Sequence, residues 1–274
     1  KGIAENVDIP LKGKMYDFET AWFKDGVLNI YTSYKNGLSK KKNYFCTRYS
    51  LATKKSESAM IFRVDKKEKP KLKLSKNEQF MMAITEKKKD KKSFYVNYGV
   101  INHENEWVEQ GENILCQLQN DYSSSNYFVT NKGNVIFSVT TRLPKKSVLK
   151  KRNHTEEIFG LKQGQLTKII AEDAAEFVSP KVFFVDRDGS LRICCLFGES
   201  ANRFSGISIS DVNENNFTIG ANKNFLFKDI VDNSLPQGRI GSYQKITKIR
   251  TSADGSIFIL SENFSERMVT TTTR

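Results

Sequence analysis

The chain has 274 residues, of which 38% are hydrophobic and 11% aromatic, and its formal net charge at pH 7 is +13. This apolar content suffices for a well-buried core, so the composition excludes global disorder. No apolar stretch approaches the roughly 20 residues of a membrane-spanning helix. No secretory signal peptide is recognisable. Because the first residue is Lys1 rather than Met, we expect that an N-terminal segment has been removed.

A turn containing Gly, followed by a short alternating apolar strand, recurs along the chain. It occurs at 25–31 (DGVLNIY), 132–137 (KGNVIF), 188–193 (DGSLRI) and 254–259 (DGSIFI), with a degenerate copy at 77–84 (NEQFMMAI). The spacing is about 55 residues, and a period of this length made of strands and turns is typical of propeller blades. We therefore predict an all-β, β-propeller-like fold of about five four-stranded antiparallel blades.

The expected blades form a single domain. Their predicted bounds are 16–74, 75–125, 126–180, 181–245 and 246–274, the last completed by residues 1–15. Pairing of the two ends of the chain would then close the ring, and the alternative is a piece of a larger propeller. Alternation predicts strands at 16–23, 27–34, 44–51, 60–64, 79–85, 94–100, around Trp107, and at 127–130, 135–141, 156–161, 166–170, 181–185, 191–197, 206–212, 217–219, 247–251, 257–262 and 267–273.

Three segments between these strands have a different character. The lysine-rich run 66–76 is expected to be a connection or an outer edge, and the polar run 121–126 a loop at a blade boundary. The longer insertion 222–241 carries apolar residues close to helical spacing. Long insertions in repeat folds often line a functional face.

These repeats resemble β-propeller repeats in general, through a D-G hairpin turn that leads into an apolar inner strand. The chain is most similar to uncharacterised bacterial propeller-like proteins of the cell envelope. This resemblance implies export to the periplasm, the outer membrane surface or the medium, with a cytoplasmic location as the alternative. It brings no catalytic residues with it.

Lysines supply most of the positive charge and gather in three clusters, at 40–42, 66–76 and 87–92. A basic surface attracts nucleic acid, anionic glycans or membranes, while lysines on strand edges also prevent edge-to-edge aggregation. Nucleic-acid sites usually combine Arg with exposed aromatic side chains. Because Arg is scarce in these clusters, a nucleic-acid partner is disfavoured.

Residue types suited to metal or redox chemistry do not form a recognisable motif. The four cysteines show no C-x-x-C pair, so we expect buried free thiols, with a disulfide between distant blades left open: Cys46, Cys116, Cys194 and Cys195. His103 and His154 lie in polar turns. The D-x-D-G run at Asp186 lacks the acidic twelfth residue of a calcium loop and predicts a hairpin turn. No cofactor and no metal are expected.

Two groups of side chains are candidates for a site. Carboxylates near strand ends could supply a glycosidase acid and base: Asp17, Glu19, Glu172, Asp173 and Glu262. Aromatic residues near turns could stack on sugars or anchor a protein partner: Trp22, Trp107, Tyr122, Tyr127 and Tyr243. The competing interpretation of the aromatic residues is packing between blades.

From these features we expect a non-enzymatic binding or scaffolding module that recognises a protein partner or an anionic glycan through loops on one face of the ring. The first alternative is a polysaccharide-active hydrolase or lyase, with a carboxylate or Tyr/Lys site in the central channel. The second alternative is nucleic-acid binding through the lysine clusters.

Overall fold

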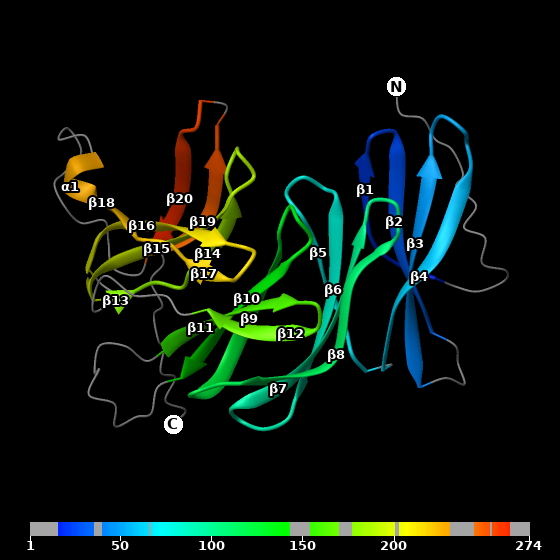
Figure 1. Ribbon diagram of the computed structural model, residues 1–274, viewed down its shortest axis with the longest axis horizontal. Helices are drawn as coiled ribbons and strands as arrows, with labels where there is room; N and C mark the ends of the chain where they lie inside the picture. Colours follow the sequence, from blue (N-terminus) through cyan, green and yellow to red (C-terminus); the bar gives the residue numbers. More distant parts are fainter. Residues whose placement is uncertain are drawn as a thin grey trace, which may run out of the picture. The chain divides into compact units, whose positions relative to one another are not determined.

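The computed structural model describes residues 16–35, 40–65, 67–142, 154–169, 177–200, 203–230, 244–252 and 254–263. Within these ranges the chain is almost entirely β-structure, and the single helix is the four-residue α1 (Phe227–Ile230). The strands form five sheets in chain order (Figure 1). The prediction of an all-β, propeller-like fold is confirmed, and several of the sheets are four-stranded and antiparallel. Within the same ranges, no helix is long and apolar enough to cross a membrane.

The first two sheets are regular four-stranded meanders. The first has the order β1 (Asp17–Lys24), β2 (Val27–Lys35), β3 (Lys41–Ser50) and β4 (Ser56–Asp65). The second has the order β5 (Lys71–Leu74), β6 (Phe80–Lys88), β7 (Ser93–Asn102) and β8 (Trp107–Gln117). All neighbouring strands in both sheets are antiparallel.

The remaining sheets follow in sequence. The third contains β9 (Asp121–Val129), β10 (Val135–Arg142), β11 (His154–Lys162) and β12 (Gln165–Ile169). The fourth contains β13 (Phe177–Val178), β14 (Val182–Val185), β15 (Leu191–Ser200), β16 (Arg203–Asn213), β17 (Thr218–Ile219) and β18 (Lys223–Leu226). The fifth is the hairpin of β19 (Gln244–Thr251) and β20 (Ile257–Asn263).

The segments between the predicted strands have different outcomes. Residues 121–126, expected to be a loop, belong to β9, which lies at an edge of its sheet and therefore tolerates polar residues. Part of the run 66–76 forms β5, an edge of the second sheet, as the sequence predicts. In the insertion, residues 223–230 form β18 and α1. The predicted strand 267–273 and the proposed closing strand in 1–15 lie outside the described residues.

The turns that define the repeat share one backbone feature. Gly26, Gly133, Gly189 and Gly255 all have φ between +80° and +88°, a region that glycine enters without strain. In the degenerate copy Glu78 takes this place, with φ of 60°. In every one of these turns except that of Gly26, the amide at this position donates a hydrogen bond to the carbonyl three residues earlier. The sequence repeat is therefore a repeat of turn geometry.

By its contacts the chain divides into two compact units. The first unit comprises 1–117, 129–135 and 161–166, and the second comprises 118–128, 136–160 and 167–274. A core in the first unit lies between the first two sheets and contains Tyr31, Tyr44, Cys46, Ile61, Val64, Met81 and Ile101. Two cores of the second unit are centred on Leu191 and Leu196. All four cysteines are buried and free, as predicted.

Candidate functional site

Two carboxylates converge on one lysine in the first sheet. The pairing of β1 with β2 shifts register between Phe18 and Thr20, which leaves Glu19 in a bulge. Such bulges re-aim a side chain. Ser33 Oγ donates a hydrogen bond of 2.6 Å to Glu19 Oε1, and Lys42 Nζ donates one of 3.0 Å to the same oxygen. Lys42 Nζ also lies 3.6 Å from Asp17 Oδ2.

The members of this cluster differ in their exposure to solvent. The side chains of Lys42 and Glu19 are 10% and 16% exposed, while that of Asp17 is 66% exposed. Both carboxylates contact the ammonium group of Lys42. The distance between Asp17 Oδ2 and Glu19 Oε1 therefore cannot exceed the sum of their distances to Lys42 Nζ. The cluster therefore has an inner, largely buried carboxylate and an outer, accessible one.

Burial and partners act in opposite directions on the two inner groups. Burial raises the pKa of Glu19, but the hydrogen bonds from Ser33 and Lys42 and the charge of Lys42 outweigh it, so the pKa lies below its usual range. Burial lowers the pKa of Lys42, yet its contacts with Glu19 and Tyr44 raise it overall. The arrangement keeps Glu19 ionised and Lys42 protonated.

Tyr44 lies beneath this ion pair. Its side chain is buried in the core of the first unit, and Lys42 Nζ sits 4.9 Å from the centre of its ring. Burial is the main reason that the pKa of Tyr44 is raised. Tyr44 is therefore a neutral phenol that supports Lys42 from below.

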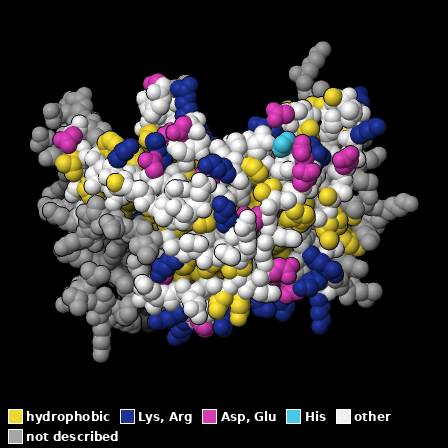
Figure 2. Space-filling view, in the orientation of Figure 1, with side chains coloured by type: hydrophobic (Ala, Val, Ile, Leu, Met, Phe, Trp, Pro, Cys, Tyr) yellow, Lys and Arg dark blue, Asp and Glu magenta, His cyan; other side chains and the backbone are white. Residues whose placement is uncertain are grey.

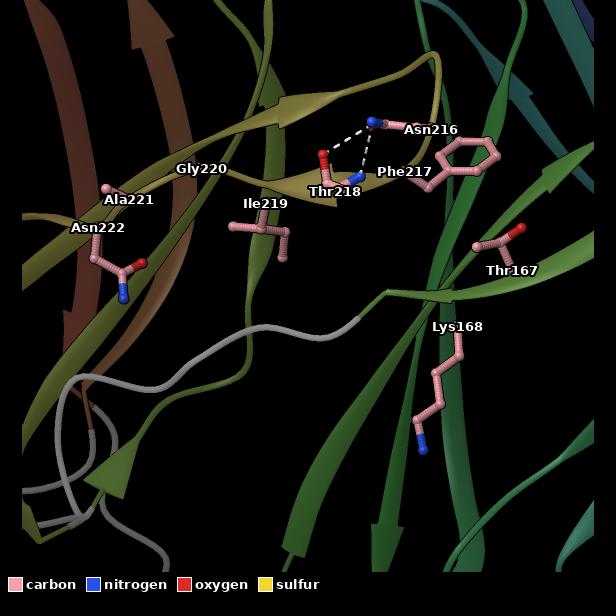
Figure 3. A pocket seen from close by; sticks show the side chains of 9 residues that line it. All are labelled: Thr167, Lys168, Asn216, Phe217, Thr218, Ile219, Gly220, Ala221 and Asn222. Atoms are coloured by element: carbon pink, nitrogen blue, oxygen red, sulfur yellow. Dashed lines mark hydrogen bonds between the residues drawn. The ribbon is translucent and has the colours of Figure 1, made fainter.

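A separate cavity of about 620 Å³ lies in the second unit (Figure 3). Its lining comes from the end of β12 and the segment around β17: Thr167, Lys168, Asn216, Phe217, Thr218, Ile219, Gly220, Ala221 and Asn222. No carboxylate is among these residues. In Figure 3 the side chain of Lys168 extends away from the segment 216–222. Its Nζ contacts Glu157 Oε2 at 2.6 Å.

The wall of this cavity is held in a fixed conformation. Phe217 has φ of 55°, unusual for a bulky residue, and its ring lies over Gly160. Asn216 Oδ1 accepts hydrogen bonds from the backbone N and the Oγ1 of Thr218 (Figure 3). The cavity thus offers amide and hydroxyl groups for binding but no evident acid or base.

The carboxylates named from sequence have different outcomes. Asp17 and Glu19 meet at Lys42, as described. Glu172 and Asp173 lie outside the described residues, as does the side chain of Glu262. Sequence reasoning missed Lys42 as a member of the site, although a signal exists. Lys42 shares the inward-facing parity of Tyr44 and Cys46 on β3, where a lysine is unusual.

The aromatic candidates differ in their exposure and contacts. Trp22 stacks on Tyr31 with ring centres 4.8 Å apart, and Tyr127 is 2% exposed. Tyr122 is half-buried, with its hydroxyl 3.4 Å from Ser125 Oγ. Trp107 is 45% exposed and lies over Gly99. Tyr243 lies outside the described residues. A ligand-binding role for these residues stays a prediction.

Metal-binding side chains are scattered in the described part of the chain. There, no three His, Cys, Asp or Glu residues are placed to hold a metal ion. His103 Nε2 lies 3.9 Å from Glu104 on an exposed turn. Asp186 begins a hairpin turn in which Gly189 N donates to its carbonyl, as the sequence predicts.

No protein family and no curated protein matches the chain. Among solved structures it is similar to an acylaminoacyl peptidase from Pyrococcus horikoshii, at 10% identity and a TM-score of 0.37, over 89% of this chain and 43% of the peptidase. It is similar to the β-propeller domain of the Trilobed protease from Pyrococcus furiosus, at 11% identity and a TM-score of 0.33, over 93% and 80% of the two chains. Similarity to the polysaccharide lyase Uly1 has 10% identity and a TM-score of 0.40, over 90% and 68%.

These neighbours correct one expectation from the sequence. We expected a non-enzymatic binding or scaffolding module, whereas the similar structures come from a peptidase, a protease and a polysaccharide lyase. The chain spans less than half of the peptidase. At these identities the likeness concerns the fold, and it assigns no substrate or residue role to this chain.

Proposed function

We propose that this protein is a glycoside hydrolase that acts on a polysaccharide, with Asp17 and Glu19 as its reacting carboxylates. The observation that carries the proposal is the convergence of both carboxylates on Lys42 Nζ, at 3.6 and 3.0 Å. Carboxyl groups about 5–5.5 Å apart are used by retaining glycosidases, and about 6.5–9.5 Å by inverting ones. The two contact distances set an upper limit on the separation of the contacting oxygens, and the retaining range and the short end of the inverting range lie within this limit.

The environments of the two groups suggest their roles. Glu19 is kept ionised by Ser33 and Lys42, which suits a nucleophile or a group that stabilises an oxocarbenium ion. The proposal assigns to Asp17, the exposed member, the exchange of a proton with the glycosidic oxygen and then with water. Lys42 positions both carboxylates.

The same cluster favours hydrolysis over a lyase reaction. Elimination needs a base that removes a proton from the carbon next to the sugar carboxylate. The two candidates for that base, Lys42 and Tyr44, both have raised pKa values and so retain their protons. An ionised carboxylate is what hydrolysis requires.

Export to the cell envelope of a bacterium belongs to this proposal, since a polysaccharide substrate would be met there. The sequence resemblance to propeller-like envelope proteins is its support. Fractionation of the native host, with an antibody against the chain, tests the location.

The test of activity uses a panel of plant, algal and bacterial polysaccharides. Released reducing ends report hydrolysis, and ultraviolet absorbance of a new C4–C5 double bond reports elimination. We expect reducing ends without that absorbance, and a loss of at least ~100-fold in D17N and E19Q, in the range contributed by acid–base groups. The matched control is D65N, which removes an exposed carboxylate that pairs with Lys41 at 2.6 Å in the same sheet.

Two outcomes would refute the proposal. One is activity that D17N and E19Q leave at the level of D65N, and the other is product that carries the double bond. Because Asp17 is mostly exposed, D17N keeps the test valid even if E19Q folds poorly. Azide restoring turnover to E19A with formation of a glycosyl azide would identify Glu19 as the nucleophile.

A further inference from the structure

The turn between β6 and β7 carries the most concentrated positive charge among the described residues of the first unit. We call its five exposed lysines the lysine tip: Lys87, Lys88, Lys89, Lys91 and Lys92. Lysines commonly protect sheet edges from aggregation. That explanation covers Lys87 and Lys88, because β5 ends opposite Ile84 and leaves the last part of β6 as an edge. It does not cover Lys89, Lys91 and Lys92, which lie in the turn itself, so their charge needs another explanation.

The backbone of the lysine tip is held in place by its own hydrogen bonds. The amides of Lys89 and Asp90 both donate to Ser93 O, at 3.0 and 3.1 Å. The Asp90 carboxylate accepts from Lys92 N and from Ser93 Oγ, each at 2.7 Å. These bonds, first that from Ser93, lower the pKa of Asp90. The lysines thus project from an ordered turn.

Two nearby carboxylates pair with lysines outside the tip, although the charge of Lys87 also acts on Asp65 and that of Lys89 on Asp90. Glu86 Oε1 lies 2.7 Å from Lys71 Nζ, and Asp65 Oδ1 lies 2.6 Å from Lys41 Nζ. The Asp90 carboxylate serves the turn. Exposed Lys67, Lys69 and Lys73 on the neighbouring segment add further positive charge. In Figure 2 Lys and Arg side chains, drawn in dark blue, are scattered over the face shown, with several along its lower edge.

We propose that the lysine tip binds an anionic polysaccharide, which makes acidic glycans the substrate class; this assignment rests on the proposed hydrolase function. Lysine ammonium groups act as point charges that accept sulfate or carboxylate groups in many orientations. Segment 86–93 contains no Arg, and Lys89 Nζ covers the ring of Tyr95 at 5.7 Å. This turn therefore has no Arg to form paired hydrogen bonds and no open aromatic ring on which a base could stack, the two features that nucleic-acid sites use.

The experiment measures binding rather than turnover, with the whole chain carrying D17N so that substrate is not consumed. The probes are fluorescent heparin, fluorescent polygalacturonate, neutral dextran and a single-stranded DNA of matched charge. The tip variant is K87Q/K88Q/K89Q/K91Q/K92Q. The matched control K35Q/K55Q/K132Q/K223Q/K248Q removes the same charge from exposed lysines elsewhere.

We expect the tip variant to bind the acidic glycans at least ~10-fold more weakly at ~50 mM salt, with a shallower salt dependence, while the control changes by less than about threefold. Equal losses in the two variants would overturn the proposal, because only net charge would matter. DNA bound more tightly than both glycans through the same lysines would also overturn it, in favour of a nucleic-acid partner. Glycan binding that depends on the lysine tip, without hydrolysis of any polysaccharide in the panel, would support the lysine tip as a glycan-binding surface and would refute the proposed hydrolase function.

Discussion

Replacing Lys42 by Met tests whether the inner ion pair is as strongly coupled as its burial implies. Removing one partner of a buried pair costs about 3–5 kcal/mol, and exposed pairs contribute about 0–1 kcal/mol. With Lys42 10% and Glu19 16% exposed, and with Ser33 still donating to Glu19, we expect K42M to cost about 2–3 kcal/mol. For a chain of this size that corresponds to a fall in Tm of roughly 5–10 °C.

The assay is chemical denaturation at several pH values, with K41M as the control. Lys41 and Asp65 form a pair of similar length but are 46% and 49% exposed, so K41M should change stability by less than ~1 kcal/mol. Because the pKa of Glu19 is lowered in the fold, its contribution is present above the usual value of 4.5 and is lost as pH falls below it. The difference in the free energy of unfolding between wild type and K42M should therefore become smaller as pH falls below 4.5.

A double-mutant cycle separates this coupling from other effects of the substitution. The variant E19Q/K42M has no unpaired buried charge and should be more stable than K42M at pH 7. Equal costs for K41M and K42M, or a gap that is constant with pH, would show that Lys42 does not hold Glu19 ionised. The role of Glu19 in the proposed reaction would then lose its physical basis.

Three further substitutions test other parts of the structure. G160A places a methyl group 2.4 Å from Phe217 Cγ and should lower the free energy of unfolding by about 1–3 kcal/mol or more. G220A, whose new methyl group meets only ordinary contacts, should be tolerated. Equal free energies of unfolding for the two variants would refute this packing. Glu109 accepts a hydrogen bond from Tyr98, and its pKa is raised, mainly by burial. Its stabilising contribution is therefore present at low pH and is lost as pH rises above 4.5. In thermal melts at several pH values, the Tm of E109Q should depend less on pH over that interval than the Tm of the wild type. E78G should stabilise by roughly 0.5–1 kcal/mol, because φ of 60° suits glycine, and a loss of stability in urea titrations would contradict this.

The fold was predictable because each repeat contains the same kind of turn, which the sequence marks with glycine at most of its positions. Glycine at positive φ is a strong local signal, and it places Gly26, Gly133, Gly189 and Gly255 correctly without any knowledge of tertiary contacts. The alternation that defines β2 and β10 is equally local. By contrast, β9 is polar because it lies at an edge, and that position depends on which strands pair.

The candidate site was only half predictable. Asp17 and Glu19 stood out as carboxylates near a strand end, but their common partner lies two strands away. Lys42 resembled a member of a surface cluster, since Lys41 beside it is exposed and Lys40 has the same charge. The bulge at Glu19, which turns that side chain toward β3, depends on strand register and leaves no mark in the sequence.

The order of the strands also has a consequence for how the chain folds. In the first, second and fifth sheets each strand pairs with the next one along the chain, and hairpin turns with local hydrogen bonds join most of these strands. Such short-range pairings give a low contact order and close small loops first, which favours rapid folding. Each meander can therefore form during synthesis as its fourth strand leaves the ribosome, before the packing of sheet against sheet buries its faces.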